Sequence, residues 1–256
     1  MSELLQARVA AALEFLRLET AKANLTQHLQ TAQERELSTL EVLDALLADE
    51  LAARKERSLS VNTKLAHFPA IKTIDSFEYD AQPTLDRRAI NALQTLAFIE
   101  RCEGVAFLGP SGLGKTHLAI GLGLKALQAG VRVYFLSAQD LLDQINAAQL
   151  DGIPGHKQRH LNNVQLLIVD EIGYVEFDKK AATWFFQLMC QRHERRSTII
   201  TSNKAFADWG EIFGGDAIMA GAMLDRYLHH CHVLNLKGES YRMRSRKRTL
   251  ASSKVS

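Results

Sequence analysis

The sequence predicts an α/β fold in which a five-stranded parallel sheet is flanked by helices and preceded by a small, all-helical N-terminal domain. Two observations carry this prediction. Short apolar runs alternate with helical stretches from about residue 84 onward, an order typical of βαβ units and a parallel sheet. Before them, residues 3–57 contain neither glycine nor proline, as expected of nearly continuous helix.

The N-terminal domain, residues 1–60, is predicted to consist of helices with one apolar face. Ser38 and Glu41 have the spacing of a capping box and predict the start of a helix. That helix carries leucines at helical spacing: Leu40, Leu43, Leu46, Leu47 and Leu51. Because so small a segment holds no core of its own, we expect this stripe to pack on its own chain or on a sister copy, with a partner protein as the alternative.

A connector is expected over residues 61–83, where Pro69 interrupts the pattern, followed by a main domain over 84–241 and a basic tail over 242–256. Gly130 is the expected stop of the second helix of the main domain. The expected order is helix 84–101, strand 105–108, a helix to Ala129, strand 131–136, helix 138–149, and further strands at 166–169, 198–201 and 233–236.

The turn after the first strand has the full P-loop pattern G-x-x-x-x-G-K-[ST] at residues 109–116. Its glycines let the backbone curl so that N–H groups point at phosphate oxygens, and the next helix presents its positive end to the same anion. The pattern predicts ATP and magnesium as ligands, with Lys115 on the β- and γ-phosphates and the Thr116 hydroxyl on the metal. The expected nucleotide-binding residues are Gly109, Pro110, Ser111, Gly112, Leu113, Gly114, Lys115, Thr116 and His117. His117 is expected to serve the helix rather than catalysis.

Further polar groups follow the later strands of the predicted sheet. Asp170 and Glu171 come directly after the buried strand 166–169, at the edge where ligands gather in open α/β sheets. Asp170 is predicted to hold magnesium, and Glu171 to polarise the attacking water as general base. If strand 198–201 lies between the P-loop strand and the Asp170 strand, Asn203 faces the γ-phosphate or the water; a plain turn asparagine is the alternative. The sequence thus predicts an ATPase.

Composition and charge indicate a reduced, cytoplasmic protein with one basic end. Its three cysteines are scattered and odd in number, so neither a disulfide framework nor a zinc finger is expected. No apolar stretch is long enough to cross a bilayer and no secretory signal is visible, so no membrane partner is expected. The net charge of +2 is unevenly distributed along the chain, because residues 1–60 carry a net charge of −3 and residues 242–256 carry +6. A basic cluster suits phosphate backbones, with a solvated tail as the alternative.

The run from about Ile71 to Arg246 resembles the IstB-like helper ATPases of insertion-sequence transposition, which are bacterial AAA+ proteins related to the DnaC helicase loaders. The resemblance rests on the P-loop region 109–119 and on these blocks: TIDSF (73–77), QP (82–83), DEIGY (170–174), TSN (201–203), WGE (209–211), LDR (224–226) and KGESYR (237–242). It implies an AAA+ core to which the N-terminal helices are the family's small appended domain. Only 20 residues follow the last expected strand, so no C-terminal helical lid is expected.

The resemblance also implies roles for two arginines. Arg226 stands where the family has an arginine finger, which reaches into the ATP site of a neighbouring subunit and implies a homo-oligomer. A guanidinium there stabilises the negative charge of γ-phosphoryl transfer. Arg242 resembles the sensor-2 arginine that touches the γ-phosphate within its own subunit, although without a lid it would act from a short tail. Ordinary surface arginines are the alternative for both.

Two basic segments are candidates for DNA. In related initiator-type ATPases an extra helical element between the second and third strands contacts DNA, and here that stretch contains Lys157 and Arg159. We expect them to bind the phosphate backbone with little regard to base sequence, with a solvated loop as the alternative. The tail adds Arg244, Arg246, Lys247 and Arg248.

Together these inferences predict an ATP-dependent accessory ATPase that oligomerises on duplex DNA and delivers or activates a transposase at target sites. The transposase comes from the resemblance alone. One alternative is a DnaC-like loader of a replicative helicase. Another is a stand-alone P-loop phosphotransferase, which Glu171 and Arg226 disfavour.

Overall fold

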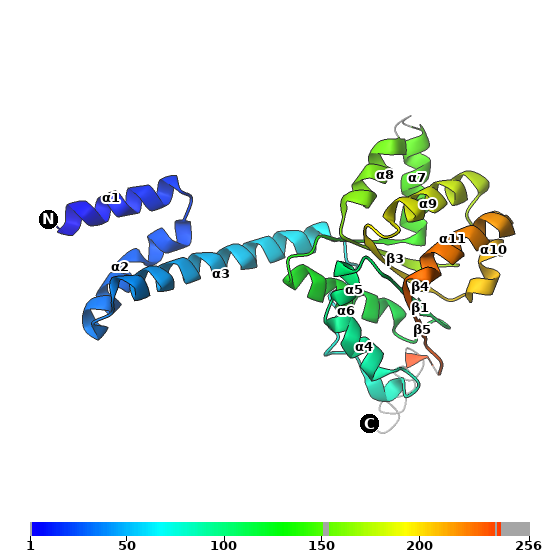
Figure 1. Ribbon diagram of the computed structural model, residues 1–256, viewed down its shortest axis with the longest axis horizontal. Helices are drawn as coiled ribbons and strands as arrows, with labels where there is room; N and C mark the ends of the chain where they lie inside the picture. The colour runs from blue at the N-terminus through cyan, green and yellow to red at the C-terminus, as the bar shows by residue number, and fades with distance from the viewer. Residues whose placement is uncertain (1, 151–153, 239, 242–256) are drawn as a thin grey trace, which may run out of the picture. The chain divides into compact units, whose positions relative to one another are not determined.

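The computed structural model of the chain describes residues 2–150, 154–238 and 240–241 (Figure 1). The chain divides into two compact units between Val61 and Asn62. Within the described ranges, no helix is both long and apolar enough to span a membrane.

The N-terminal unit consists of α1 (Ser2–Phe15), α2 (Glu19–Arg35) and most of α3 (Thr39–Leu65). The expectation that so small a segment holds no core of its own is wrong, because the unit has a small core of Leu13, Ala21, Leu25 and Leu46. The buried carboxylate of Glu50 in α3 accepts hydrogen bonds from the backbone N–H groups of Thr20, at 2.8 Å, and Ala21, at 3.1 Å. These N–H groups belong to the first turn of α2, so α3 supplies the N-terminal cap that α2 lacks in its own sequence.

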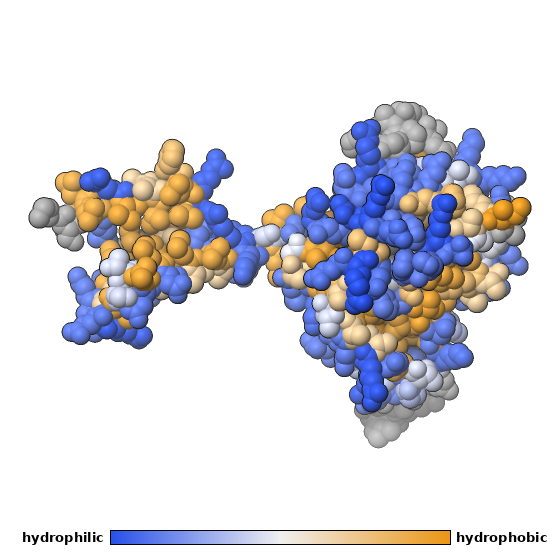
Figure 2. Space-filling view, viewed as in Figure 1, coloured by the Kyte–Doolittle hydropathy of each residue, from blue (hydrophilic) through white to orange (hydrophobic). Residues whose placement is uncertain are grey.

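The start of α3 confirms the predicted capping box. The Ser38 N–H donates to Glu41 Oε2 at 2.7 Å, and the Glu41 N–H donates to Ser38 Oγ at 3.3 Å. Of the five leucines of the predicted stripe, Leu46 is buried, and four remain exposed: Leu40, Leu43, Leu47 and Leu51. Figure 2 shows apolar side chains gathered on the visible face of this unit. The helix continues to Leu65, beyond the predicted start of the connector at residue 61, because no helix breaker precedes Pro69.

The second unit is built on a five-stranded parallel sheet with the strand order β2-β3-β4-β1-β5. This confirms the predicted fold class. The strands are β1 (Gly104–Leu108), β2 (Val133–Ser137), β3 (Leu166–Ile172), β4 (Ser197–Ser202) and β5 (Cys231–Asn235). Strand β4 lies between β1 and β3, so the carboxyl ends of these three strands meet at one edge.

Helices cover both faces of the sheet (Figure 1). On one face α6 (Lys115–Gln128) packs on the strands, with α4 (Arg87–Gln94) and α5 (Ala97–Glu100) beside it. The other face is covered by α7 (Ala138–Leu150), α8 (Pro154–Asn163), α9 (Lys179–Arg192) and α11 (Ala217–His229). The short elements are η1 (Tyr79–Ala81), η2 (Phe206–Asp208) and α10 (Trp209–Ile212).

The single helix predicted over residues 84–101 is wrong, because the structure divides it into α4 and α5. The break lies at Leu96, which has a left-handed φ of 63°. Before it, the Thr95 hydroxyl donates to the carbonyl of Ala92 at 2.8 Å and accepts from the N–H of Ala97 at 3.4 Å. These local bonds compete with the helical ladder and end it.

Candidate functional site

The loop between β1 and α6 is the centre of the candidate site. Gly109, Gly112 and Gly114 have φ values of 138°, 82° and 90°, a region that side chains with a Cβ rarely adopt. At Gly114 a Cβ would also lie 2.5 Å from Cε2 of Phe77. Glycine is therefore required here both by the backbone conformation and by the space available.

The start of α6 faces this loop. The N-cap of α6 is Gly114, so no side chain caps the first turn of the helix. The Lys115 Nζ donates to the carbonyl oxygens of Gly109, at 2.7 Å, and Pro110, at 2.8 Å. The loop thus brings a helix N-terminus and an ammonium group together, which is the chemistry that binds phosphate.

Asp170 connects α6 to two strands. Its carboxylate accepts hydrogen bonds from the hydroxyls of Thr116, at 2.8 Å, and Thr201. Burial raises the pKa of the Asp170 carboxyl above its ordinary value, while the hydrogen bonds from Thr201 and Thr116 lower it and the neighbouring Glu171 raises it further. A buried carboxylate beside a threonine hydroxyl is an all-oxygen donor set of the kind that magnesium prefers, so these residues fit the ion.

Glu171 lies next to Asp170 on β3, yet its side chain is exposed while that of Asp170 is buried. The pairing of β3 with β4 shifts register between Val169 and Ile172, and Glu171 has a left-handed φ of 63°. Its N–H is held by the Thr201 hydroxyl at 2.9 Å. The irregularity re-aims a side chain at the end of a strand, which is a common use of a β-bulge near functional sites.

A cavity of about 480 Å³ opens over the loop and is large enough for a nucleotide. Residues 111–117 line it on one side, together with Glu171 and Thr201. The other lining residues come mainly from the segment before α4 and include Lys72, Phe77 and Gln82. The cavity thus joins the P-loop to a segment that precedes it by some 30 residues in the sequence.

His117 holds that preceding segment in place. Its Nε2 lies 2.8 Å from the carbonyl oxygen of Thr73 and 3.2 Å from Oγ of Ser76. Its ring also meets that of Phe77 edge-on, with 5.3 Å between centroids. Sequence reasoning did not assign a role to Phe77 or Gln82; the available signal was that both lie in blocks that carried the family resemblance.

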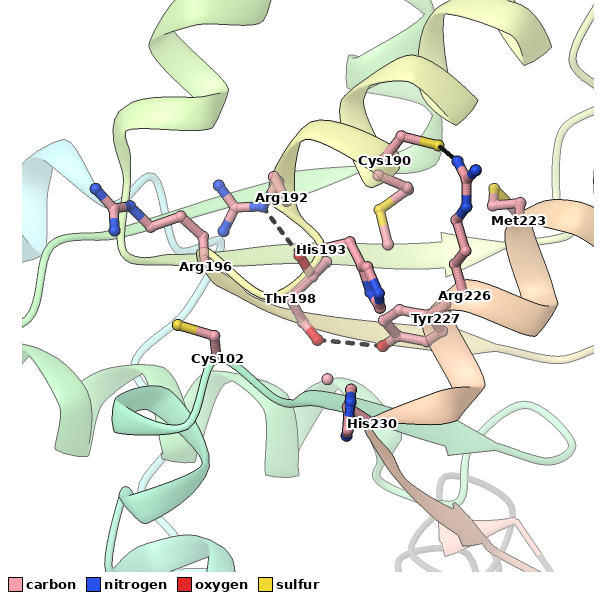
Figure 3. Close-up of a pocket in the computed structure, with 12 residues that line it drawn as sticks. Cys102, Cys190, Arg192, His193, Arg196, Thr198, Met223, Arg226, Tyr227 and His230 are labelled. Carbon is pink, nitrogen blue, oxygen red and sulfur yellow. Dashed lines mark hydrogen bonds between the residues drawn. The ribbon is translucent and has the colours of Figure 1, made fainter.

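Asn203 and Arg226 are not brought into this cavity. Asn203 follows β4 and lies beside Gly173, and its buried Oδ1 has no hydrogen-bond partner among the described residues. Arg226 lies on α11, where its Nη1 donates to Sγ of Cys190 at 2.8 Å (Figure 3). The small cavity beside Arg226 is lined by Gly104, the first residue of β1, so it lies at the amino end of the strand whose carboxyl end carries the P-loop. Within one subunit, Arg226 and the loop belong to opposite edges of the sheet.

The candidate DNA contacts are only partly described. Arg159 lies exposed on α8, the helix inserted between β2 and β3. The side chain of Lys157 lies outside the described residues, as do Arg242, Arg244, Arg246, Lys247 and Arg248.

A parallel sheet in this order, a glycine-rich loop after β1 and an Asp-Glu pair at the end of β3 define a P-loop ATPase. The chain belongs to the family of IstB-like ATP-binding proteins, whose family model matches residues 11–249.

Relatives of known description support the family. The chain is 45% identical over 216 residues to an insertion sequence IS5376 ATP-binding protein of Geobacillus stearothermophilus, covering 84% of this chain and 86% of the relative. It is 42% identical over 233 residues to an insertion sequence IS21 ATP-binding protein of Pseudomonas aeruginosa, covering 91% and 88%. Among solved structures, DnaI superposes with a TM-score of 0.55 at 16% identity, over 65% of this chain and 91% of that one, which is a likeness of fold.

Proposed function

We propose that this chain is an accessory ATPase that assembles with copies of itself on duplex DNA and delivers or activates a transposase at target sites. The observation that carries the proposal is the division of the catalytic groups between two edges of the sheet. Asp170 and Glu171 stand at the loop, whereas Arg226 stands at the other edge of the same unit. An arginine in this position reaches an ATP only in a neighbouring copy. The rate of ATP hydrolysis therefore depends on assembly of the subunits.

Each residue at the loop has a role in this proposal. Lys115 turns from its loop carbonyls to the β- and γ-phosphates, and Thr116 and Asp170 hold the magnesium ion, which neutralises charge on the β- and γ-phosphates when bound. Glu171, exposed at the cavity, accepts a proton from the attacking water. Asn203 is assigned to orient that water from the end of β4, the strand between β1 and β3, and its side chain has to turn toward the cavity to do so.

Arg226 of a neighbouring subunit stabilises the charge of the transition state, and Arg242 acts as a second contact to the γ-phosphate. The insertion-sequence names of the relatives support a transposase as the partner. Residues 1–60 are proposed as the domain for contact with the transposase or with other copies of the chain, because the leucine stripe of α3 is mostly exposed. Residues 61–83 then serve as the connector, 84–241 as the ATPase domain and 242–256 as a basic tail.

DNA binding is proposed for Lys157 and Arg159 together with Arg244, Arg246, Lys247 and Arg248. These side chains suit phosphate contacts that are largely independent of base sequence.

The decisive experiment measures particle mass and phosphate release over a range of protein concentrations, with ATP and magnesium, with and without duplex DNA. We expect activity per subunit to rise steeply with concentration and with DNA, in step with a large increase in mass. Activity per subunit that is constant across the range, in a particle that stays monomeric, contradicts the proposal.

A further inference from the structure

Gln82 carries a buried amide that has no hydrogen-bond partner among the described residues. The residue is 3% exposed, and neither Oε1 nor Nε2 is bonded within the described part of the chain. Its backbone, in contrast, is fixed, because its N–H donates to Tyr79 O at 2.9 Å and its carbonyl accepts from Leu85 N at 3.1 Å. Leaving a donor and an acceptor buried and unpaired is costly, so such groups in a native fold call for an explanation, of which a functional role is one.

Gln82 is one of the residues that line the cavity over the P-loop. Residues 111–116 and Glu171 provide the polar side of that cavity, where a triphosphate fits. The rest of the lining includes the apolar Ile120 and the ring of Phe77. Since the cavity is continuous, a nucleotide with its phosphates on the loop directs its base toward this remaining part, which offers flat apolar contact and one unpaired amide.

We propose that Gln82 selects adenine by pairing its amide with the 6-amino group and N7 of the base. An amide presents an acceptor beside a donor, and the adenine edge presents a donor beside an acceptor, so two hydrogen bonds form together. Guanine carries a carbonyl oxygen in place of the 6-amino group, so its edge with N7 presents two acceptors. The amide oxygen of Gln82 then finds no donor on that edge. The inference concerns the choice of nucleotide and does not depend on DNA, transposase or assembly.

A purely structural role for Gln82 leads to the opposite behaviour in the nucleotide-free protein. An amide that held the segment before α4 in place would leave the fold weaker when replaced. An unpaired buried amide instead destabilises the nucleotide-free state, so Gln82→Leu is expected to raise its melting temperature while reducing the further rise that ATP causes.

The test is a double-mutant cycle that combines a substitution at Gln82 with removal of the 6-amino group from the base. Calorimetry with magnesium compares ATP with purine riboside triphosphate, which lacks the 6-amino group, for the natural protein and for Gln82→Leu. We expect the natural protein to prefer ATP by about tenfold to hundredfold, the discrimination typical of a bidentate amide–adenine pair, and the variant to lose most of that preference. Gln94→Leu is the matched control, since Gln94 lies on α4, outside the cavity lining, and is bonded to Asn91 and Lys125.

The outcomes separate cleanly. A preference for ATP that persists unchanged in Gln82→Leu overturns the proposal. Equal binding of both triphosphates by the natural protein also overturns it, and that measurement does not require a folded variant. If Gln82→Leu does not fold, Gln82→Met keeps the length of the side chain but removes the acceptor for the 6-amino group together with the donor, and the same loss of preference is expected. A natural protein that binds no adenine nucleotide at all would instead count against the ATP site itself.

Discussion

Thr116 and Asp170 are 54 residues apart in the sequence, yet the Thr116 hydroxyl donates to Asp170 Oδ1 at 2.8 Å. The pair joins the first turn of α6 to the end of β3. Both side chains offer oxygen atoms of the kind that magnesium prefers, and the Thr116 hydroxyl can ligate a cation through a lone pair while its hydrogen still donates to Asp170. This contact is therefore where we expect magnesium to bind.

The titration of Asp170 is expected to control magnesium binding. Because burial raises the pKa of its carboxyl above 3.8, a proton and the cation compete for the same oxygens. Magnesium-dependent ATP binding should weaken as the pH falls through this raised pKa, and binding should release protons in that range. Calorimetry in buffers of different ionisation enthalpy measures the release.

The same pKa shift has a consequence for stability. A carboxyl whose pKa is higher in the folded than in the unfolded chain stabilises the fold below the unfolded value and loses this contribution as the pH rises through the folded value. Asp170→Asn is therefore expected to raise the melting temperature of the nucleotide-free protein at pH 7 while abolishing the effect of magnesium. Asp178→Asn, at the N-cap of α9, is the control. Magnesium binding that keeps its pH dependence in Asp170→Asn contradicts the assignment.

Lys115→Ala should weaken ATP binding by roughly tenfold to a hundredfold, because it removes charge-assisted hydrogen bonds to the phosphates. The matched control is Lys125→Ala, at the other end of α6, where the ammonium contacts Gln94. Isothermal calorimetry gives both affinities. Equal affinities for the two variants would exclude Lys115 from the phosphate site.

Mixing two inactive variants tests the shared site. Glu171→Gln is expected to retain ATP and stop turnover, whereas Arg226→Ala should bind ATP normally and hydrolyse it about a thousandfold more slowly. In a mixture, some interfaces combine an intact Glu171 with an intact Arg226, so phosphate release should partly return. Arg195→Ala, an exposed arginine in the turn after α9, should remain active alone. If the mixture stays inactive while the two variants still co-assemble, Arg226 does not act across subunits.

Arg192 is expected to be the strongest single polar contribution to the stability of the second unit. It is 1% exposed and donates to the carbonyl oxygens of Leu161, Val164 and Ser197 and to the Thr198 hydroxyl. Burial lowers the pKa of its guanidinium to about 9. Arg192→Met should lower the free energy of unfolding by about 3 kcal/mol or more, since several buried acceptors lose their donor.

Urea denaturation measures this loss, with the exposed Arg196→Met as the control. A change under about 1 kcal/mol, within the range of an ordinary surface substitution, would mean that water or neighbouring groups replace the lost donor.

DNA binding by α8 should be visible in the salt dependence of affinity. Replacing both Lys157 and Arg159 with alanine is expected to reduce the slope of log affinity against log salt by about two, because the variant leaves two phosphates without a cationic partner. Fluorescence anisotropy with duplexes of unrelated sequence measures the slope. Lys22→Ala, an ammonium paired with Glu14, is the control, and an unchanged slope in the double variant would remove α8 from the DNA surface.

The sequence by itself determined the class of fold and the content of the phosphate site. The P-loop pattern prescribes its own geometry, because its glycines, lysine and threonine act within eight consecutive residues. The alternation of strands and helices is likewise local, as is the capping box at Ser38, and all three are found in the structure. The prediction of one helix over residues 84–101 was wrong because nothing in their composition indicated that Thr95 would end a helix there.

Only the tertiary structure decided which distant residues meet. A strand pattern does not reveal that β3 changes register near Glu171. Because of this irregularity, the Glu171 side chain does not follow the regular alternation of side chains along the strand. Nor does a strand pattern reveal that Gln82 is buried against the nucleotide cavity, or that Arg226 lies at the opposite edge from the loop. The reason is physical, because all three features depend on contacts between segments far apart in the chain. They are the direction of a side chain at a bulge, the pairing of a buried amide, and the edge of the sheet at which a helix ends.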